Sequence, residues 1–285
     1  MLDLDGLVFF LELLAASVLA GILGSLLGLG GGIIIIPVLT LVFGVPTLFA
    51  IGASIVSVIA TSSGSASTYV KDKITNLRIG MFLEIATTTG AVTGAVCTLA
   101  LARANLENVV YIIFGIVLLF SVLPLLKQIG EELPPQNFKP DRISKKLELN
   151  GEYYDTVLKT EVHYQGTRSR LALAIMYAAG VISGLLGIGS GVLKVIAMDV
   201  GMKLPMKVSS TTSNFMIGVT AAASTGIFYL GGYINPFIAS PVVMGVVLGS
   251  IVGTRILTRS SNKSIRKLFI PILVILAIEM LFHGL

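Results

Sequence analysis

Gly21-Ile-Leu-Gly-Ser-Leu-Leu-Gly-Leu-Gly-Gly-Gly32 and Gly180-Val-Ile-Ser-Gly-Leu-Leu-Gly-Ile-Gly-Ser-Gly191 are two versions of one stretch, an apolar run that ends in a cluster of glycines. Their offset, 180 − 21 = 159 residues, continues beyond the glycines. It matches Pro46 with Pro205, Ser54 with Ser213, Thr61 with Thr220, Ser65 with Ser224, Gly90 with Gly249 and Gly94 with Gly253. A constant register over about seventy residues indicates an internal duplication. A duplicated, glycine-broken apolar segment predicts a membrane transporter built from two repeats around a shared site.

The composition places most of the chain in lipid. Of its 285 residues, 54% are hydrophobic and 12% are charged, and the mean hydropathy is +0.93. A soluble domain carries roughly twice that share of charge. The net charge of +5 suggests no nucleic-acid partner, because the basic residues crowd into a few loops, as membrane topology requires. The single cysteine, Cys97, excludes a disulfide framework or a cysteine-based metal site within one chain.

Ten apolar segments predict an all-α integral membrane protein. They fall at about 7–27, 31–44, 48–70, 79–102, 108–127, 170–187, 191–202, 206–230, 235–258 and 267–284. Most reach the ~20 residues that a spanning helix needs. Residues 31–44 would extend only about 21 Å, against a hydrocarbon core of about 30 Å, and 191–202 would extend less. These two segments, which directly follow the glycine clusters, are predicted to be short, broken helices whose ends are buried in protein or face water.

The basic residues orient the chain. They gather in three groups: Lys71, Lys73 and Arg78; Lys194, Lys203 and Lys207; and Arg255, Arg259, Lys263, Arg266 and Lys267. If the connections that carry these three groups are cytoplasmic, and successive segments cross the membrane in alternate directions, both termini lie outside the cytoplasmic membrane and the loop 128–169 lies inside. Arg103 is the one basic residue that this orientation places on an outer link, against the positive-inside rule. Five segments in each half, 1–127 and 170–285, make the two repeats inverted.

The polar loop 128–169 has no counterpart in the first half. It begins with Glu131-Glu-Leu-Pro-Pro135, a sequence that stops helices. Asn150-Gly151 lies among residues of alternating polarity and is a strong hairpin signal. The loop is therefore predicted to hold a small antiparallel β element. It has too few apolar residues for an independent core, which favours a linker with local pairing over a regulatory domain.

The glycine clusters predict an anion site. A phosphate-binding loop would need a preceding strand and an acid or a Gly-Lys-Ser/Thr sequence downstream, and neither is present. Close helix packing accounts for Gly90, Gly94 and the glycines at 245, 249 and 253, but not for three glycines within five residues at a helix end. There we expect unwound backbone with exposed N–H groups, which bind anions without a cationic side chain. The predicted residues are Gly28, Gly30, Gly31 and Gly32 in the first half and Gly187, Gly189, Ser190 and Gly191 in the second.

A helix rich in small hydroxyl groups follows each short segment. In the second half, six consecutive polar residues occupy 209–214. Such a density favours a polar, water-accessible lining, because a buried amide in hydrocarbon is costly; hydrogen bonds that only join helices are the alternative. Thr212, Ser213 and Asn214, with Ser54 of the first half, are the candidate substrate ligands.

Four charged residues are candidates for function inside the membrane. Lys194 lies within an apolar segment, where its twin position is Ile35, and an intramembrane lysine indicates function by default. Pairing with Asp199, or snorkelling toward the interface, is the competing interpretation. Lys203 would add positive potential. Glu84 and Glu279 also lie in apolar runs, and either could carry coupled protons.

Enzyme chemistry is poorly supported. The two histidines, His163 and His283, form no zinc motif. A serine hydrolase would need a base beside its serine, and the sequence offers no good candidate. We therefore predict no catalytic residues, no cofactor and no metal.

Gly28-Leu-Gly-Gly-Gly32 with the proline that follows its short helix, Gly184-Leu-Leu-Gly-Ile-Gly-Ser-Gly191, and Thr212-Ser-Asn-Phe-Met-Ile-Gly-Val-Thr220 resemble the sulfite exporter TauE/SafE family of membrane transporters. The resemblance covers nearly the whole chain except 128–169. It implies transport of sulfite, sulfonates such as sulfoacetate, or other organosulfur or carboxylate anions. This chain has Ser190 where its first half has Gly31, and Gly52-Ala53-Ser54 where its second half has Thr-Thr-Ser. The second half is the more polar, so we expect it to contribute more to the substrate site.

The resulting hypothesis is a secondary transporter for a small sulfur oxyanion or organosulfonate, working by alternating access in the cytoplasmic membrane. Export of an anion from a negative-inside cell is downhill by about 2.3 kcal/mol per charge per 100 mV, whereas uptake would need a coupled cation, most simply H⁺. An anion channel, a carrier of a non-sulfur carboxylate, a membrane-embedded enzyme and a non-transporting scaffold are the alternatives. The expected partners are the anion and the lipid bilayer, and a homodimer is left open.

Overall fold

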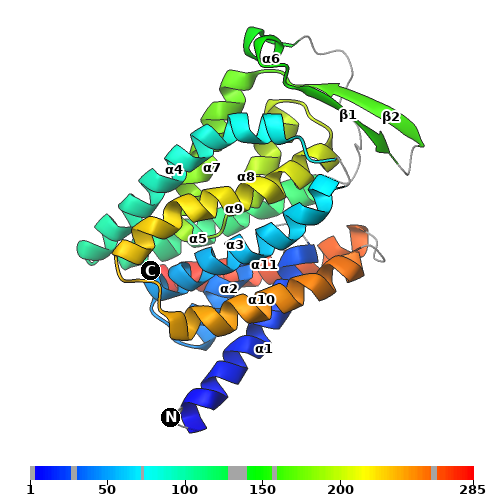
Figure 1. Ribbon diagram of the computed structural model, residues 1–285. Helices are drawn as coiled ribbons and strands as arrows, with labels where there is room; N and C mark the ends of the chain where they lie inside the picture. The colour runs from blue at the N-terminus through cyan, green and yellow to red at the C-terminus, as the bar shows by residue number, and fades with distance from the viewer. Residues whose placement is uncertain (1–3, 27–30, 72–73, 128–139, 156–158, 258–261) are drawn as a thin grey trace.

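The computed structural model describes residues 4–26, 31–71, 74–127, 140–155, 159–257 and 262–285, and it is mostly helical (Figure 1). The first half contains α1 (Leu4–Leu26), α2 (Gly32–Pro37), the π-helix η1 (Val38–Val42), α3 (Thr47–Lys71), α4 (Leu77–Arg103) and α5 (Glu107–Lys127). The connecting segment holds α6 (Arg142–Lys146), β1 (Asn150–Asp155) and β2 (Thr160–Gln165). The second half contains α7 (Ser169–Leu186), α8 (Gly191–Ile196), η2 (Ala197–Gly201), α9 (Met206–Leu230), α10 (Pro236–Leu257) and α11 (Asn262–Gly284).

All ten predicted apolar segments are helical, and the offset of 159 residues also relates their ends. Adding 159 to the bounds of α2, η1 and α3 gives 191–196, 197–201 and 206–230, which are the bounds of α8, η2 and α9. The duplication seen in the sequence is therefore also a duplication of secondary structure.

The prediction of one short, broken helix in each half is confirmed. Six residues of α-helix run directly into five residues of π-helix in α2–η1, and the same lengths recur in α8–η2. Pro37 lies inside the first of these helices, but the equivalent residue in the second is Ile196. The widened turn therefore does not depend on a proline.

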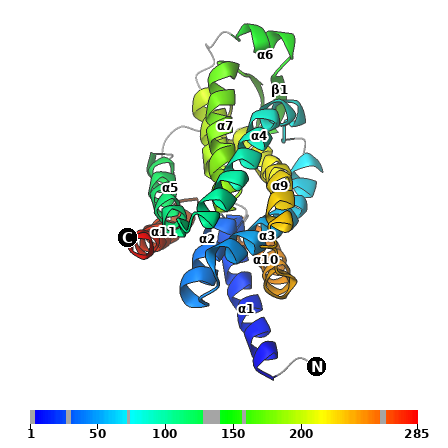
Figure 2. The ribbon, with the colours of Figure 1, turned by 90° about the vertical axis from the view of Figure 1, so that its left-hand side faces the viewer.

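The two halves exchange their first helices. Helix α1 packs along α10 of the other half, and α7 packs along α4. Helix α3 packs on α9 and α5 packs on α11, so each of these pairs joins equivalent helices (Figures 1 and 2). Glycines allow the exchanged contacts: a Cβ at Gly184 would lie 1.9 Å from the carbonyl oxygen of Ala91, and one at Gly249 would lie 2.1 Å from that of Val18. The helix-packing interpretation of Gly90, Gly94 and Gly249 is confirmed, since their Cβ positions also meet neighbouring backbone.

The connections gather at two ends of the bundle. At one end, Thr47 donates a hydrogen bond to Tyr111, and the ring of Tyr111 lies 5.9 Å from that of His283. At the other end, the α3–α4 connection contacts the strands, and Thr167 before α7 bonds to Met202 after η2. The C-terminus and the strands therefore lie at opposite ends (Figure 1).

The predicted β element exists, but its turn is elsewhere. Strands β1 and β2 are antiparallel, with Asn150 opposite Gln165 and Asp155 opposite Thr160. Asn150-Gly151 was expected at the turn and instead begins β1. Close packing explains its glycine, because a Cβ at Gly151 would lie 2.4 Å from the hydroxyl oxygen of Tyr164. The hairpin docks on the helices, with Tyr153 and Val162 packing on Val208 of α9.

The outer surface of the helices is apolar. Among the described residues, four helices are long and apolar enough to span a membrane: Gly6–Gly24, Leu77–Arg103, Ser169–Leu186 and Pro236–Gly253. Exposed side chains on these helices include Leu19, Met81, Ile85 and Met244. Large apolar side chains exposed in such numbers are expected when the surrounding solvent is lipid.

Candidate functional site

In the second half the glycine cluster ends one helix and begins the next, and in both halves the short helix begins after a residue in the left-handed region. Gly187 ends α7 with a φ of 67°. Gly31 precedes α2 with a φ of 77°, and its equivalent, Ser190, precedes α8 with a φ of 43°. A non-glycine residue in this left-handed region is strained. The Ser190 hydroxyl offsets that strain by donating a 2.6 Å hydrogen bond to the carbonyl of Ala179.

The two breaks meet in the interior. Ser54 of α3 donates a 2.9 Å hydrogen bond to the carbonyl of Gly187, which belongs to the other half. A Cβ at Gly32 would lie 2.7 Å from the Ser54 hydroxyl and 3.2 Å from that carbonyl, so only glycine allows this approach. On the second half, Ser213 of α9 donates a 3.1 Å hydrogen bond to the carbonyl of Gly191. We call this region, defined by Gly32, Ser54, Gly187, Gly191 and Ser213, the crossing.

The polar run 209–214 lies beside the crossing and is largely buried. Ser213 and Thr212 are 0% exposed, and Asn214 is 8% exposed. Thr212 accepts a hydrogen bond from the backbone of Asn76, and the carbonyl of Asn214 accepts one from Ser62 of α3. These bonds join helices, as the alternative interpretation expected. A water-accessible lining in another conformation stays a prediction.

A network of buried polar side chains continues from the crossing. Lys194 of α8 donates a 2.5 Å hydrogen bond to the hydroxyl of Thr220 in α9. Thr220 in turn lies 2.6 Å from Oε1 of Glu84 in α4 and donates to it. Lys194 and Thr220 are 0% exposed, and Glu84 is 7% exposed. We call Glu84, Thr220 and Lys194 the buried charge network.

This network gives Lys194 a partner that the sequence did not indicate. The side chain does not snorkel to the surface, since it is fully buried, donates to Thr220 and is attracted by the charge of Glu84. A lysine and a carboxylate compensate each other in a medium that solvates neither. Of the two predicted proton carriers, Glu84 is buried in this network, whereas Glu279 is exposed on α11.

The structure brings five of the predicted site residues together at the crossing: Gly32, Ser54, Gly187, Gly191 and Ser213. Lys203 does not join them: it follows η2 at the hairpin end, half-buried and with a φ of 59°. Gly189 packs on Ile217 and Val58. Gly28 and Gly30 lie outside the described residues. Thr220 was missed as a site residue; the sequence offered only its register with Thr61.

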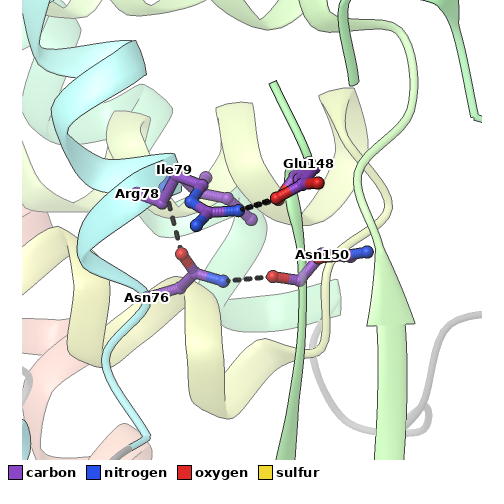
Figure 3. Close-up of polar contacts among 5 residues, drawn as sticks. All are labelled: Asn76, Arg78, Ile79, Glu148 and Asn150. Carbon is purple, nitrogen blue, oxygen red and sulfur yellow. Dashed lines mark hydrogen bonds and ion pairs between the residues drawn. The ribbon is translucent and has the colours of Figure 1, made fainter. Parts of the chain in front are cut away.

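Asn76 connects the hairpin to α4 (Figure 3), and its backbone N–H also reaches Thr212 of the polar run. Its side-chain oxygen accepts a 3.0 Å hydrogen bond from the N–H of Ile79 and thereby caps α4. Its amide nitrogen donates to the carbonyl of Asn150 at 2.9 Å and to the hydroxyl of Tyr164 at 3.0 Å. Burial raises the pKa of Tyr164, and the hydrogen bond from Asn76 partly offsets this rise. Asn76 therefore connects the hairpin to α4 through its side chain and bonds to Thr212 through its backbone N–H.

Asn76→Ala is expected to lower the free energy of unfolding by about 1–2 kcal/mol, because it removes the cap of α4 together with two hydrogen bonds to the hairpin. Arg78→Ala is the matched control. It removes an exposed 2.8 Å ion pair with Glu148, which is worth less than about 1 kcal/mol. Hydrogen exchange should show lost protection of β1 and β2 in Asn76→Ala only. Equal protection in the two variants would contradict this role of Asn76.

In the part of the chain that the structure describes, no group of three or more His, Cys, Asp or Glu side chains could hold a metal ion. Among the same residues, the buried polar groups are hydroxyls, an amide, backbone carbonyls and the opposite charges of Glu84 and Lys194. Such groups can bind and release a small polar solute, which is what a transporter requires.

Broken helices that meet at a buried polar region inside an apolar bundle are typical of membrane transporters. The chain belongs to the sulfite exporter TauE/SafE family, whose model matches residues 13–280. It is similar to the probable membrane transporter protein YunE of Bacillus subtilis (strain 168), at 28% identity over 283 residues, covering 96% of this chain and 98% of the relative. It is also similar to the probable membrane transporter protein YdhB of the same strain, at 25% identity over 228 residues, covering 80% and 82%. No solved structure matches the chain. The family is one of membrane transporters, which agrees with the expectation that the chain is not an enzyme.

Proposed function

We propose that this protein is a secondary transporter that moves a small sulfur oxyanion, sulfite or an organosulfonate such as sulfoacetate, by alternating access between two inverted repeats. The observation that carries the proposal is the meeting of the two glycine breaks at Ser54. This meeting brings the starts of two short helices, whose positive dipole ends favour an anion, to one buried polar region. The family to which the chain belongs is described as one of sulfite exporters, which favours a sulfur oxyanion over a carboxylate.

The distribution of charge supports an orientation with the hairpin in the cytoplasm. The described basic residues at the hairpin end include Arg78, Lys145, Lys146, Lys159, Arg168, Lys203 and Lys207. Arg103 lies at the opposite end, with both termini and the uncharged links. By the positive-inside rule, the termini are then outside the cytoplasmic membrane.

A binding assay tests the substrate class and the site together. Purified protein in detergent is melted by circular dichroism, since the chain has no Trp, in the presence of sulfite, sulfate, thiosulfate, sulfoacetate, taurine, phosphate and small carboxylates. An anion present at a hundred times its Kd should add about 2.7 kcal/mol to the free energy of unfolding. We expect a sulfur oxyanion to give this shift, and Ser54→Ala and Ser213→Ala to reduce it.

Ser121→Ala is the control for these variants. Its hydroxyl is equally buried and donates a 2.8 Å bond to Val117 within α5, so the variant loses a comparable bond away from the crossing and should keep the shift. Proteoliposomes then distinguish a carrier from a channel, because only a carrier gives saturable counterflow. The absence of any shift with the whole panel would contradict the proposed function, and a shift confined to carboxylates would contradict the substrate class.

A further inference from the structure

The charges of the buried charge network cancel, so an additional anion would give the network a net negative charge. Lys194 and Glu84 carry opposite charges in a region that excludes water, and Thr220 lies between them, 2.5 Å from Lys194 Nζ and 2.6 Å from Glu84 Oε1. An anion placed on Lys194 would leave two negative charges facing one positive charge. In a low-dielectric interior such an excess charge is far more costly than in water.

We propose that Glu84 is the proton-binding group of this transporter, and that the transported anion binds Lys194 and takes the place of the Glu84 carboxylate on Thr220. This inference rests on the proposed transport function. One proton binds to Glu84 as one anion binds to Lys194, so the site stays neutral: Glu84⁻ with Lys194⁺ becomes Glu84–COOH with Lys194⁺ and the bound anion. Anion and proton then move together in the same direction.

The hydrogen bonds of Glu84 leave one oxygen for the proton. Oε1 accepts hydrogen bonds from Thr220 and from Thr88. Oε2 is buried and, among the described residues, has no hydrogen-bond partner. A buried carboxylate oxygen without a donor is unfavourable when it is charged, and a proton on that oxygen removes the charge.

Thr220 can release Glu84 without losing its own hydrogen bond. Its hydroxyl lies 2.6 Å from Glu84 Oε1 and 2.8 Å from the carbonyl of Met216, so its single proton has two acceptors within reach. When Glu84 is protonated, this proton can turn to Met216 or to an oxygen of the anion. Lys194 keeps its donors for the same anion.

Lys194 and Thr220 lie on the same two helices as Gly191 and Ser213 of the crossing. Lys194 is three residues beyond Gly191 on α8, and Thr220 is seven residues beyond Ser213 on α9. Spacings of about one and two helical turns place each pair on one face of its helix. An anion at the crossing is therefore about one turn of α8 from Lys194.

The three positions that the 159-residue offset relates to this network cannot form a second one. Subtracting 159 from 194 and 220 gives Ile35 and Thr61, and adding 159 to 84 gives Val243. Two of the three groups are replaced by apolar side chains, so the inference predicts one proton per anion and not two.

Among the described residues, Lys194 is the charged group that acts on Glu84. The other titratable groups on the elements packed against α4 point elsewhere or lie near its ends. Tyr177 of α7 contacts Thr93 further along α4, Lys207 of α9 is exposed at the hairpin end, and Glu107 and Tyr111 of α5 lie at the opposite end.

Proton uptake on anion binding tests the inference. Methanesulfonate and ethanesulfonate are the probes, because both are monoanions and neither titrates between about pH 5 and pH 9, unlike sulfite. In weakly buffered solution at a pH where Glu84 is ionised, wild-type protein should take up close to one proton per bound anion, seen with an indicator dye. The affinity of the wild-type protein for the probe should fall by up to about tenfold per pH unit, at pH values above the one at which Glu84 titrates. The infrared difference spectrum should gain the C=O band of a protonated carboxyl.

Glu84→Gln should bind the probes with an affinity independent of pH, take up no proton and lack the infrared band. Lys194→Met should lose binding at least tenfold. Glu279→Gln is the control, because it removes an exposed acid from an equally apolar helix, and it should behave as wild type. Proton uptake and the infrared band are measured on wild-type protein and do not depend on the folding of any variant.

Wild-type protein that binds a probe without proton uptake would overturn the inference and leave the proposed function standing. Proton uptake that persists in Glu84→Gln would do the same. Failure of the wild type to bind any sulfur oxyanion at any pH would contradict the proposed function itself, and this inference with it.

Discussion

Gly184→Ala is expected to separate α7 from α4 and to lower the free energy of unfolding by at least about 2 kcal/mol. The new Cβ would lie 1.9 Å from the carbonyl oxygen of Ala91 and 2.7 Å from its carbonyl carbon. Both atoms belong to the backbone of a helix, so no side-chain rotation can relieve the contact. The whole helix would have to move, and α7 and α4 form one of the two contacts by which the halves exchange helices.

Gly226→Ala is the matched control on α9. Nothing lies within 4 Å of its Cβ position, so the substitution should be neutral or stabilise the helix by up to about 1 kcal/mol. Thermal unfolding followed by circular dichroism in detergent compares the two variants. Similar melting temperatures for Gly184→Ala and wild type would show that α7 and α4 do not pack backbone against backbone.

Lys194→Met is expected to lower the free energy of unfolding by about 3 kcal/mol or more at pH 7, because it leaves the Glu84 carboxylate buried without its compensating charge. The methionine fills a similar volume, so the loss is electrostatic and not a cavity effect. Lys145→Met, which removes an exposed lysine from α6, should change stability by less than about 0.5 kcal/mol.

The double variant Lys194→Met/Glu84→Gln should be more stable than Lys194→Met alone. The introduced glutamine would carry no charge, and its carbonyl oxygen could still accept from Thr220 and Thr88. The four proteins form a double-mutant cycle, for which we expect a coupling energy above about 1 kcal/mol. Strictly additive losses would contradict an interaction between the two charges. This cycle tests stability alone, so it is independent of any substrate.

The secondary structure could be read from the sequence in nearly every element. Apolar runs reveal membrane helices because lipid selects a continuous apolar surface, and the repeat register located both broken helices. The hairpin was found through polarity that alternates along its strands, but its turn was misplaced. Asn150-Gly151 satisfies the local rule for a turn, yet it begins β1, where the Tyr164 hydroxyl and the Asn76 amide pack against Gly151. A tertiary contact overrode a local preference.

The candidate site was predictable where both halves share it. Duplicated glycines and hydroxyls pointed to the region in which Ser54 and Ser213 bond to glycine carbonyls. The buried charge network was not predictable. Glu84 and Lys194 are 194 − 84 = 110 residues apart and have no equivalents in the other repeat. Each could be noticed as a charge in an apolar run, but the nearby Asp199 was the more obvious partner for Lys194.

The sequence by itself therefore determined that the chain is a helical membrane protein, that it is duplicated, and where its helices break, because lipid and the polypeptide backbone impose those patterns locally. Only the tertiary structure decided which charges meet. The packing of α4 against α7 and α9 brings Glu84 to Thr220, which also accepts from Lys194 of α8, and the energy of two opposite buried charges depends on that arrangement and not on separation along the chain.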